Sequence, residues 1–326
     1  MQAILYRQGC FTEVEKPTPV AQSRDLLIEI KAMSVNPIDT KVKQTLAADN
    51  DKVLGYDAAG VVIAVGDQVS LFEVGDEVFY AGDLTRDGAN ATQQLVDERL
   101  VGRKPNTLDF AQAAALPLTS ITAWESLFER LRITDKDQDK TLLLIGAAGG
   151  VGSMAIQLAK QLTGMRVVAT ASREDSKAWC QQLGADVVLG HHNLKAQFDE
   201  QGLSAPEYIL CMGHPDEYFE ELAEVVAVQG SICLLASAGQ AHDINLLKNK
   251  SVTLVWELMF TRSMYQTPDM IEQHKLLNQV SELVDQSKIQ TTLTRTLSPI
   301  NAEQLTKAHT LVEQGDMLGK VVVSQG

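Results

Sequence analysis

The sequence contains few cysteines and lacks any long uncharged apolar run. The four cysteines, Cys10, Cys180, Cys211 and Cys233, are scattered and include no CxxC pair. They therefore indicate neither a disulfide framework nor a cysteine-rich zinc site, and we expect a protein of the reducing cytoplasm. Because a membrane-spanning helix needs about 20 apolar residues in succession, we also expect no membrane segment.

Basic residues are in the minority. Lys and Arg total 28 against 42 Asp and Glu, which gives a net charge of −14. An acidic chain repels nucleic-acid backbones and anionic membranes, so we expect the main partner to be a small molecule. The histidines are dispersed, and we interpret the adjacent His191 and His192 as polar loop residues rather than metal ligands.

The middle of the chain alternates between strand and helix patterns. The apolar run TLLLIG from Thr141 precedes a helical pattern, in which apolar residues recur at three- and four-residue spacing up to Leu162. Helices are also predicted over 173–184 and 216–228. Further strands are predicted in MRVVATA, ADVVLG, PEYILCMG, GSICLLASAG and SVTLVWE. This alternation predicts an α/β, doubly wound Rossmann domain with a parallel sheet.

The first 118 residues follow another pattern. Short strand-like runs broken by Gly, Asp and Pro predict a mostly β domain, with a clear helical pattern only over 110–131, interrupted near Pro117. Near the end of the chain, 269–286 predicts a helix and MLGKVVVSQG a strand, and we expect this tail to return to the first domain. The predicted domains are 1–118 together with 262–326, and 119–261.

The segment GAAGGVG lies between the first Rossmann strand and its helix. A sharp turn favours glycine, and a pyrophosphate needs close approach to the backbone beside a helix N-terminus. A glycine motif in this strand-to-helix context predicts a dinucleotide site, with a purely structural turn as the alternative. The expected contacts come from Gly146, Ala148, Gly149, Gly150, Val151 and Gly152.

The end of the second strand indicates which dinucleotide binds. NAD-binding domains usually carry an acidic residue there to bind the ribose hydroxyls, but no acid precedes Glu174 in VVATASRED. Ser172, Arg173 and Lys177 suit a 2′-phosphate instead. The alternative is that Ser172 only caps the helix and Arg173 is a solvated charge. We therefore predict NADPH rather than NADH.

Several motifs, in this order, resemble the medium-chain dehydrogenase/reductase superfamily: SVNPIDTK (34–41), LGYDAAGVVIAVGDQVSLFEVGDEV (54–78), AAALPLTSITAW (113–124) and GKVVV (319–323). The resemblance spans nearly the whole chain and favours the quinone-oxidoreductase-like branch, whose members are often labelled zinc-type alcohol-dehydrogenase-like proteins. It implies a GroES-like catalytic domain, a homodimer, and cofactor contacts from Thr122, Gly213, Ala236 and Arg262. For Arg262, a salt bridge between domains is the alternative.

The resemblance also raises the question of zinc. Aligned by motif, the three protein ligands of the zinc enzymes correspond to Asn36, Tyr56 and Leu118 in this sequence. Zinc in such a site needs thiolate, imidazole or carboxylate ligands, and Asp57 alone cannot hold it. The hydroxyl that relays protons in the zinc enzymes corresponds to Ile38. We therefore predict a protein without a metal site.

Hydride transfer without a metal suits conjugated acceptors, because quinones and α,β-unsaturated carbonyls spread the developing negative charge. The candidate catalytic residues are Tyr56 and Asn36, as hydrogen-bond donors to the acceptor. The alternatives are an aromatic pocket wall for Tyr56 and a turn residue for Asn36, and we expect Asp39 and Asp57 to be framework positions. Two other functions stay open: a zinc alcohol dehydrogenase and a non-catalytic NADPH-binding protein.

Overall fold

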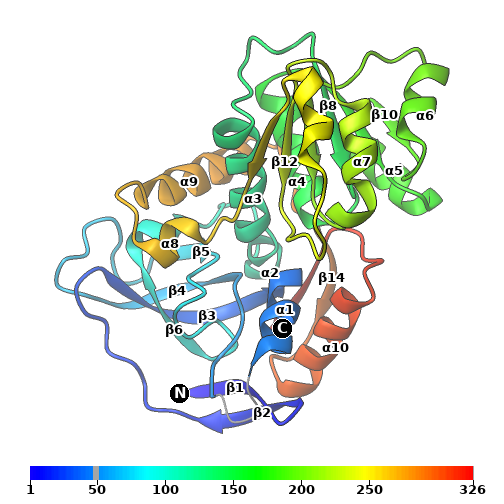
Figure 1. The fold of residues 1–326 in the computed structure, drawn as a ribbon. Coiled ribbons are helices and arrows are strands. Elements are labelled where there is room, and N and C mark those ends of the chain that lie inside the picture. The colour runs from blue at the N-terminus through cyan, green and yellow to red at the C-terminus, as the bar shows by residue number, and fades with distance from the viewer. Residues whose placement is uncertain (47–50, 326) are drawn as a thin grey trace. The chain divides into compact units, whose positions relative to one another are not determined.

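The computed structural model describes residues 1–46 and 51–325, which fold as two units (Figure 1). Unit 1 comprises Met1–Ile121 and Met259–Gly326, and unit 2 comprises Thr122–Leu258. The boundaries lie a few residues from those expected at 118 and 262. No helix in the described part of the chain is long and apolar enough to cross a membrane.

Unit 2 contains a six-stranded parallel sheet in the order β10-β9-β8-β11-β12-β13. The strands are β8 (Thr141–Ile145), β9 (Arg166–Thr170), β10 (Val187–Leu189), β11 (Tyr208–Cys211), β12 (Ser231–Leu234) and β13 (Thr253–Trp256). Strand order reverses between β8 and β11, and open parallel sheets bind ligands at the carboxyl ends of the strands at such a point. The doubly wound prediction is confirmed.

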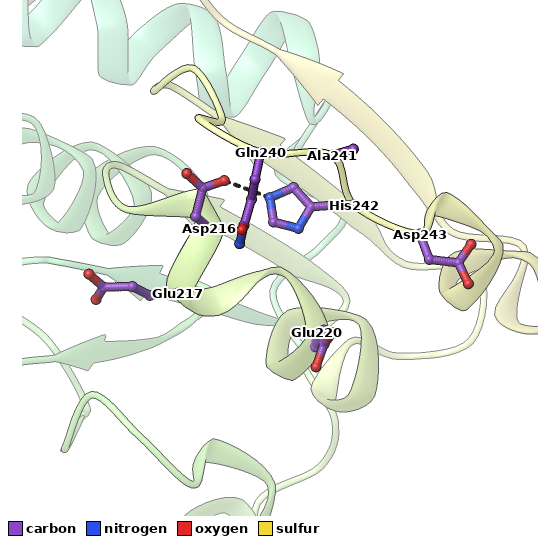
Figure 2. Close-up of a pocket in the computed structure, with 7 residues that line it drawn as sticks. All are labelled: Asp216, Glu217, Glu220, Gln240, Ala241, His242 and Asp243. Atoms are coloured by element: carbon purple, nitrogen blue, oxygen red, sulfur yellow. Dashed lines mark hydrogen bonds and ion pairs between the residues drawn. The ribbon is translucent and has the colours of Figure 1, made fainter.

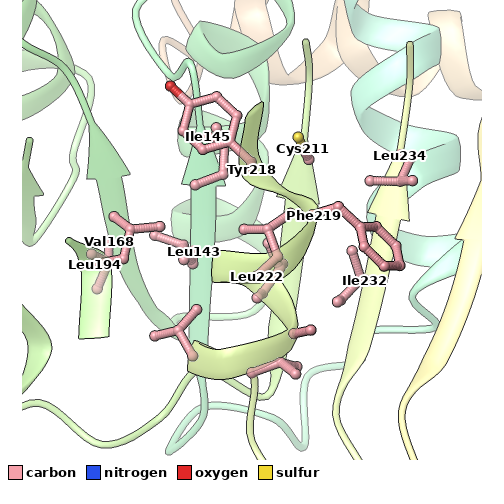
Figure 3. Close-up of a cluster of buried hydrophobic side chains, with 14 of the residues drawn as sticks. Leu143, Ile145, Val168, Leu194, Cys211, Tyr218, Phe219, Leu222, Ile232 and Leu234 are labelled. Carbon is pink, nitrogen blue, oxygen red and sulfur yellow. The ribbon is translucent and has the colours of Figure 1, made fainter. Parts of the chain in front are cut away.

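The helices of unit 2 cover both faces of this sheet. They are α4 (Gly150–Leu162), α5 (Glu174–Gln182), α6 (Leu194–Glu200), α7 (Pro215–Val225), the π-helical η2 (Glu125–Arg130) and the 3-10 helix η3 (Ile244–Lys250). Figure 3 shows Phe219 and Leu222 of α7 beside Leu143 and Ile232 of the sheet. Because strand side chains alternate between faces, the buried Leu142 belongs to the opposite face. Helix α6 was not predicted, because it is too short for a clear periodic pattern.

The first 118 residues, which belong to unit 1, are built mainly of strands, as predicted. The larger sheet of unit 1 has the order β14-β15-β3-β4-β5-β7, with β6 also paired to β3, and β1 and β2 form a separate pair. The strands are β1 (Gln2–Arg7), β2 (Cys10–Glu15), β3 (Asp25–Val35), β4 (Ala58–Val65), β5 (Glu77–Tyr80), β6 (Gln93–Asp97), β7 (Val101–Arg103), β14 (Leu293–Leu297) and β15 (Lys320–Ser324). The returning tail is confirmed, because β15 pairs with β3 and Val321 lies opposite Val35.

Three helices of unit 1 were not predicted. The helices are α1 (Pro37–Thr45), α2 (Phe110–Ala114), α3 (Pro117–Trp124, which crosses the unit boundary), α8 (Thr261–Tyr265), α9 (Ile271–Asp285), α10 (Ala302–Glu313) and the 3-10 turn η1 (Glu98–Leu100). The prediction that the first domain is clearly helical only over 110–131 was wrong. α1 was missed because it buries only Asp39 and Thr40 and so has no apolar stripe. The five-residue helix α8 and α10, both in the C-terminal segment, were likewise missed.

Candidate active site

The glycine-rich turn, residues 146–152, joins β8 to α4 and is termed here the phosphate cradle. Gly146 has a φ of 79°, a region that disfavours other residues, and its N–H donates to Thr170 Oγ1 at 3.0 Å. A Cβ at Gly146 would meet nothing within 4 Å, and one at Gly149 would meet only the Gly146 oxygen at 3.9 Å. The space that a pyrophosphate needs beside this backbone is therefore open.

Gly152 has a different role in the cradle. A Cβ there would lie 2.3 Å from the carbonyl oxygen of Ala147, so only glycine allows α4 to pack this closely on the turn. The N-cap residue Gly149 offers no side-chain cap, and the first turn of α4 has no acidic residue. The positive end of the helix dipole and its N–H groups thus suit an anion, and the cradle fits a pyrophosphate.

The predicted 2′-phosphate residues lie just beyond β9. Ser172 and Arg173 are exposed, and the N-cap of α5 is Arg173, so Ser172 is not the helix cap. Arg173 Nε lies 3.2 Å from Asp175 and Lys177 Nζ lies 2.8 Å from Glu174. Exposed pairs of this kind contribute about 1 kcal/mol or less. A more highly charged phosphate can therefore compete for both cations.

Gly213 and Ala236 follow β11 and β12, on the other side of the strand-order reversal from β9. Because the strands are parallel, the loops that hold Gly213 and Ala236 share the carboxyl edge of the sheet with the cradle.

Thr122 is buried on α3. Burial raises the pKa of Cys211 and Cys233 to about 12, so both thiols stay neutral at pH 7 and are poor nucleophiles.

In unit 1, the side chain of Asn36 lies between two buried charges at the start of α1. Its Nδ2 donates to Asp57 Oδ2 at 3.1 Å, and its Oδ1 accepts from Lys320 Nζ at 2.6 Å. A carboxylate accepts only and an ammonium donates only, so this pair fixes the orientation of the amide. The amide keeps one further hydrogen for another acceptor.

The carboxylate of Asp57 contacts residues from separate segments of this site. Its Oδ1 accepts from the backbone N–H of Leu118 at 3.0 Å, and its Oδ2 lies 3.1 Å from Lys320 Nζ. Burial raises the pKa of Asp57 and lowers that of Lys320, and the attraction between the two opposes both shifts. Asp57 is thus a framework position, as expected. We call Asn36, Asp57 and Lys320 the Asp57 cluster.

Tyr56, next to Asp57, is buried in unit 1. Its ring meets Phe260 edge-on with centroids 5.7 Å apart, and Lys52 Nζ lies 5.9 Å from its centroid. Among the described residues its hydroxyl has no hydrogen-bond partner. Burial raises the pKa of Tyr56 above its usual range, so the phenol stays neutral. The residue thus combines an aromatic wall with a hydroxyl that can still donate.

Asp39 lies on the first turn of α1. Its Oδ2 accepts from the backbone N–H of Asn36 at 2.7 Å, which fits its expected framework role. Burial raises the pKa of Asp39 to about 7, against the opposing effect of the hydrogen bond from Asn36 and the charge of Lys320. The carboxyl group is therefore partly protonated at neutral pH.

The three positions that correspond to zinc ligands converge on Asp57. Asn36 and the Leu118 backbone both bond it, and Tyr56 precedes it in the chain. An amide, a phenol and an aliphatic chain do not fit a zinc ion. Across residues 1–46 and 51–325, no group of three or more His, Cys, Asp or Glu side chains could hold a metal.

Comparison with known proteins identifies the family. The alcohol dehydrogenase GroES-like domain matches residues 22–114, and the zinc-binding dehydrogenase family matches residues 150–281. A zinc-type alcohol dehydrogenase-like protein of Staphylococcus aureus (strain MSSA476) is 40% identical over 316 residues, covering 96% of this chain and 93% of the relative. The chain belongs to the medium-chain dehydrogenase/reductase superfamily.

Other superfamily members resemble the chain as well. A solved structure from Rhizobium etli CFN 42, provisionally assigned as a zinc-dependent alcohol dehydrogenase, has a TM-score of 0.94 and 49% identity over 99% of this chain and 98% of its own. The quinone oxidoreductase of Coxiella burnetii has a TM-score of 0.82 and 27% identity over 99% of both chains. The chloroplastic NADPH-dependent alkenal/one oxidoreductase of Arabidopsis thaliana is 34% identical over 66% of this chain and 57% of its own.

Arg262 lies on α8, in the segment that the superfamily resemblance associated with the cofactor. Its Nε and Nη2 both lie 3.0 Å from Asp269 Oδ2. The guanidinium therefore has a carboxylate partner within its own unit, seven residues along the chain. Its contact with a cofactor stays a prediction.

Two groups in this superfamily member were not assigned from sequence. Lys320, in GKVVV, had no predicted role, although a lysine that opens an apolar strand indicates a buried ion pair. Asp216, on the first turn of α7, contacts His242 in the loop after β12. These residues are far apart in sequence, and no spacing rule joins them.

Proposed function

We propose that the protein is a metal-independent, NADPH-dependent reductase of quinones or α,β-unsaturated carbonyl compounds. The proposal depends chiefly on one observation: the zinc-ligand positions around Asp57 hold Asn36, Tyr56 and Leu118. A simple ketone needs a strong electrophile such as zinc, whereas conjugated acceptors disperse the charge themselves. The alkenal/one oxidoreductase and the quinone oxidoreductase support this substrate class by analogy.

The cradle, with Ser172, Arg173 and Lys177 at the end of β9, would hold NADPH. Gly213 and Ala236, and by resemblance Thr122 and Arg262, would complete the binding site. When bound, NADPH supplies the hydride that the acceptor carbon receives. The absence of an acid before Glu174 favours the 2′-phosphate over a free ribose hydroxyl.

In the proposed mechanism, Tyr56 Oη and the second N–H of the Asn36 amide donate hydrogen bonds to the acceptor oxygen as it becomes negative. Asp57 and Lys320 hold the Asn36 amide in the donating orientation. Because its pKa is raised, Tyr56 retains its proton, and the proton that completes the reduced product comes from water. The acceptor thereby gains one hydride and one proton.

The test measures consumption of NADPH and NADH with quinones, enones, aldehydes and alcohols, with and without a chelator. We expect chelator-resistant turnover of quinones or enones with NADPH, and a decrease in kcat of about 100-fold in Tyr56→Phe. Tyr80→Phe is the matched control, because Tyr80 is a second buried phenol of unit 1 that donates to Gln94. About one zinc per chain with alcohol oxidation contradicts the proposal, as does tight NADPH binding without turnover.

We also propose that two copies pair through β13, the last strand in the unit 2 sheet. Strand edges readily pair with another chain, and Trp256 and Leu258 near this edge are 50% and 46% exposed. Light scattering after gel filtration should give the mass of a dimer. Trp256→Glu should shift it toward the monomer, and a monomeric wild-type protein contradicts this assembly.

A further inference from the structure

The loop that follows β12, residues 235–243, is held at both ends. At its start, the N–H of Leu235 donates to the carbonyl oxygen of Cys211 at the end of β11, at 3.1 Å. Near its other end, His242 Nε2 lies 2.7 Å from Asp216 Oδ1 on the first turn of α7. Figure 2 shows these two side chains facing one another. The loop therefore connects the carboxyl edge of the sheet with the start of α7.

Asp216 holds the loop at a second point. Its Oδ2 accepts from the N–H of Gly239 at 2.7 Å. A Cβ at Gly239 would lie 2.9 Å from Asp216 Oδ2, so the glycine permits this close approach. The bonds from Gly239 and His242 lower the pKa of Asp216, so the carboxylate is charged at neutral pH. One carboxylate thus fixes two residues of the loop.

The contact is also anchored to the core of unit 2. The His242 ring stacks on Phe219, with centroids 4.8 Å apart and an interplanar angle of 28°, and Phe219 packs against the sheet (Figure 3). Glu217 lines the same pocket of about 300 Å³ as Asp216, but in Figure 2 it lies apart from the Asp216–His242 pair. Two neighbouring carboxylates therefore differ in whether they hold the loop.

Because of the position of the loop, the contact between Asp216 and His242 bears on how the cofactor would bind. This inference rests on the proposed function. The cradle follows β8 and the 2′-phosphate residues follow β9, so the other half of the dinucleotide extends toward β11 and β12. Ala236 lies in the loop after β12. We propose that Asp216 is a positioning residue, which holds residues 235–243 in place for the nicotinamide half of NADPH without touching it.

The test compares two ligands in two isosteric variants. Asp216→Asn weakens the contact with the loop, and Glu217→Gln removes a neighbouring charge from the same helix turn. Calorimetry gives the Kd of NADPH and of adenosine 2′,5′-bisphosphate, which lacks the nicotinamide half. We expect Asp216→Asn to weaken NADPH binding about tenfold and to leave binding of the bisphosphate unchanged, and Glu217→Gln to change neither.

Gly239→Ala disturbs the same contact from the loop side and should give the same difference between the ligands. Equal losses for both ligands in Asp216→Asn overturn the inference, because they indicate damage to the whole unit, and so does unchanged NADPH binding. These results leave the proposed function intact when the wild-type protein binds and oxidises NADPH. A wild-type protein that binds no dinucleotide refutes both.

Discussion

The cradle of unit 2 and the Asp57 cluster of unit 1 are built in opposite ways. The cradle consists of backbone, with Gly146, Gly149 and Gly152 around a helix N-terminus that has no acidic residue in its first turn. The Asp57 cluster consists of side chains that fix one another through charge. The cradle is therefore sensitive to added atoms, whereas the cluster is sensitive to lost charges.

This difference fits the proposed ligands. A pyrophosphate is already charged, so the partial charges of backbone N–H groups suffice to bind it. A quinone or enone is neutral and becomes negative only during the reaction, so it needs neutral donors that are held in place beforehand. Asp57 and Lys320 largely cancel each other's field while orienting Asn36, and Tyr56 stays a neutral phenol.

The largest effect is expected from removing one charge of the cluster. Lys320→Met leaves the Asp57 carboxylate buried without its cation, which should lower the free energy of unfolding by about 3–5 kcal/mol. Denaturant titration measures the change. Lys307→Met is the control, because Lys307 pairs with Glu303 on the exposed surface of α10, and its loss should change stability by about 0.5 kcal/mol or less.

A second substitution tests whether charge explains the loss. Asp57→Asn added to Lys320→Met removes the unpaired carboxylate and should restore part of the lost stability. A double variant less stable than Lys320→Met would contradict this account, because the lysine would then act through packing alone.

The cradle is tested by adding atoms. Gly152→Val places a Cβ 2.3 Å from the carbonyl oxygen of Ala147, so the backbone must shift, and stability should fall by about 2–3 kcal/mol with loss of NADPH binding. Gly149→Ala meets no close neighbour, so stability should be retained while the methyl group obstructs the pyrophosphate. Thermal melting and NADPH titration separate the two effects. Equal destabilisation by both variants would contradict the division of roles among the glycines.

The same contrast explains what could be predicted from the sequence. The cradle depends on local patterns, since strand, glycines and helix follow one another between Thr141 and Leu162. The Asp57 cluster joins Asn36, which follows β3, Asp57, which precedes β4, and Lys320, the first residue of β15. Only the pairing of β15 with β3 brings Lys320 beside Asn36. The loop contact of Asp216 likewise needs the strand order. The helix α1 escaped detection because a buried Asp39 and its capping bond replace an apolar stripe.

Asp39, which bonds the backbone of Asn36 beside the Asp57 cluster, is expected to make the stability of the protein depend on pH. The folded-state pKa of Asp39 is about 7, above the usual value of 3.8. Its protonated form therefore contributes stability at low pH that is lost as the pH rises through 7, about 2 kcal/mol between pH 5 and pH 8. Asp39→Asn mimics the protonated form and should lack this component in denaturant titrations at both pH values.

The exposed Asp67→Asn serves as the control for Asp39→Asn and should keep the wild-type pH profile. The residues of the cradle carry no titratable side chain, so its binding of pyrophosphate groups should change little over this range. A profile for Asp39→Asn that is identical to the wild type would show that the buried carboxyl is not the titrating group.

The smallest effect concerns the side chains that border the cradle. Arg173→Ala should weaken NADPH binding about tenfold or more and leave NADH binding unchanged, because only NADPH carries the 2′-phosphate. Arg166→Ala is the matched control, since Arg166 is an exposed arginine at the opposite end of β9. Arg166→Ala changes the net charge of the protein as much as Arg173→Ala does, but it leaves the 2′-phosphate site unchanged. Fluorescence titration with both dinucleotides distinguishes the outcomes, and an equal loss for NADPH and NADH would show that Arg173 supports the cradle rather than recognising the phosphate.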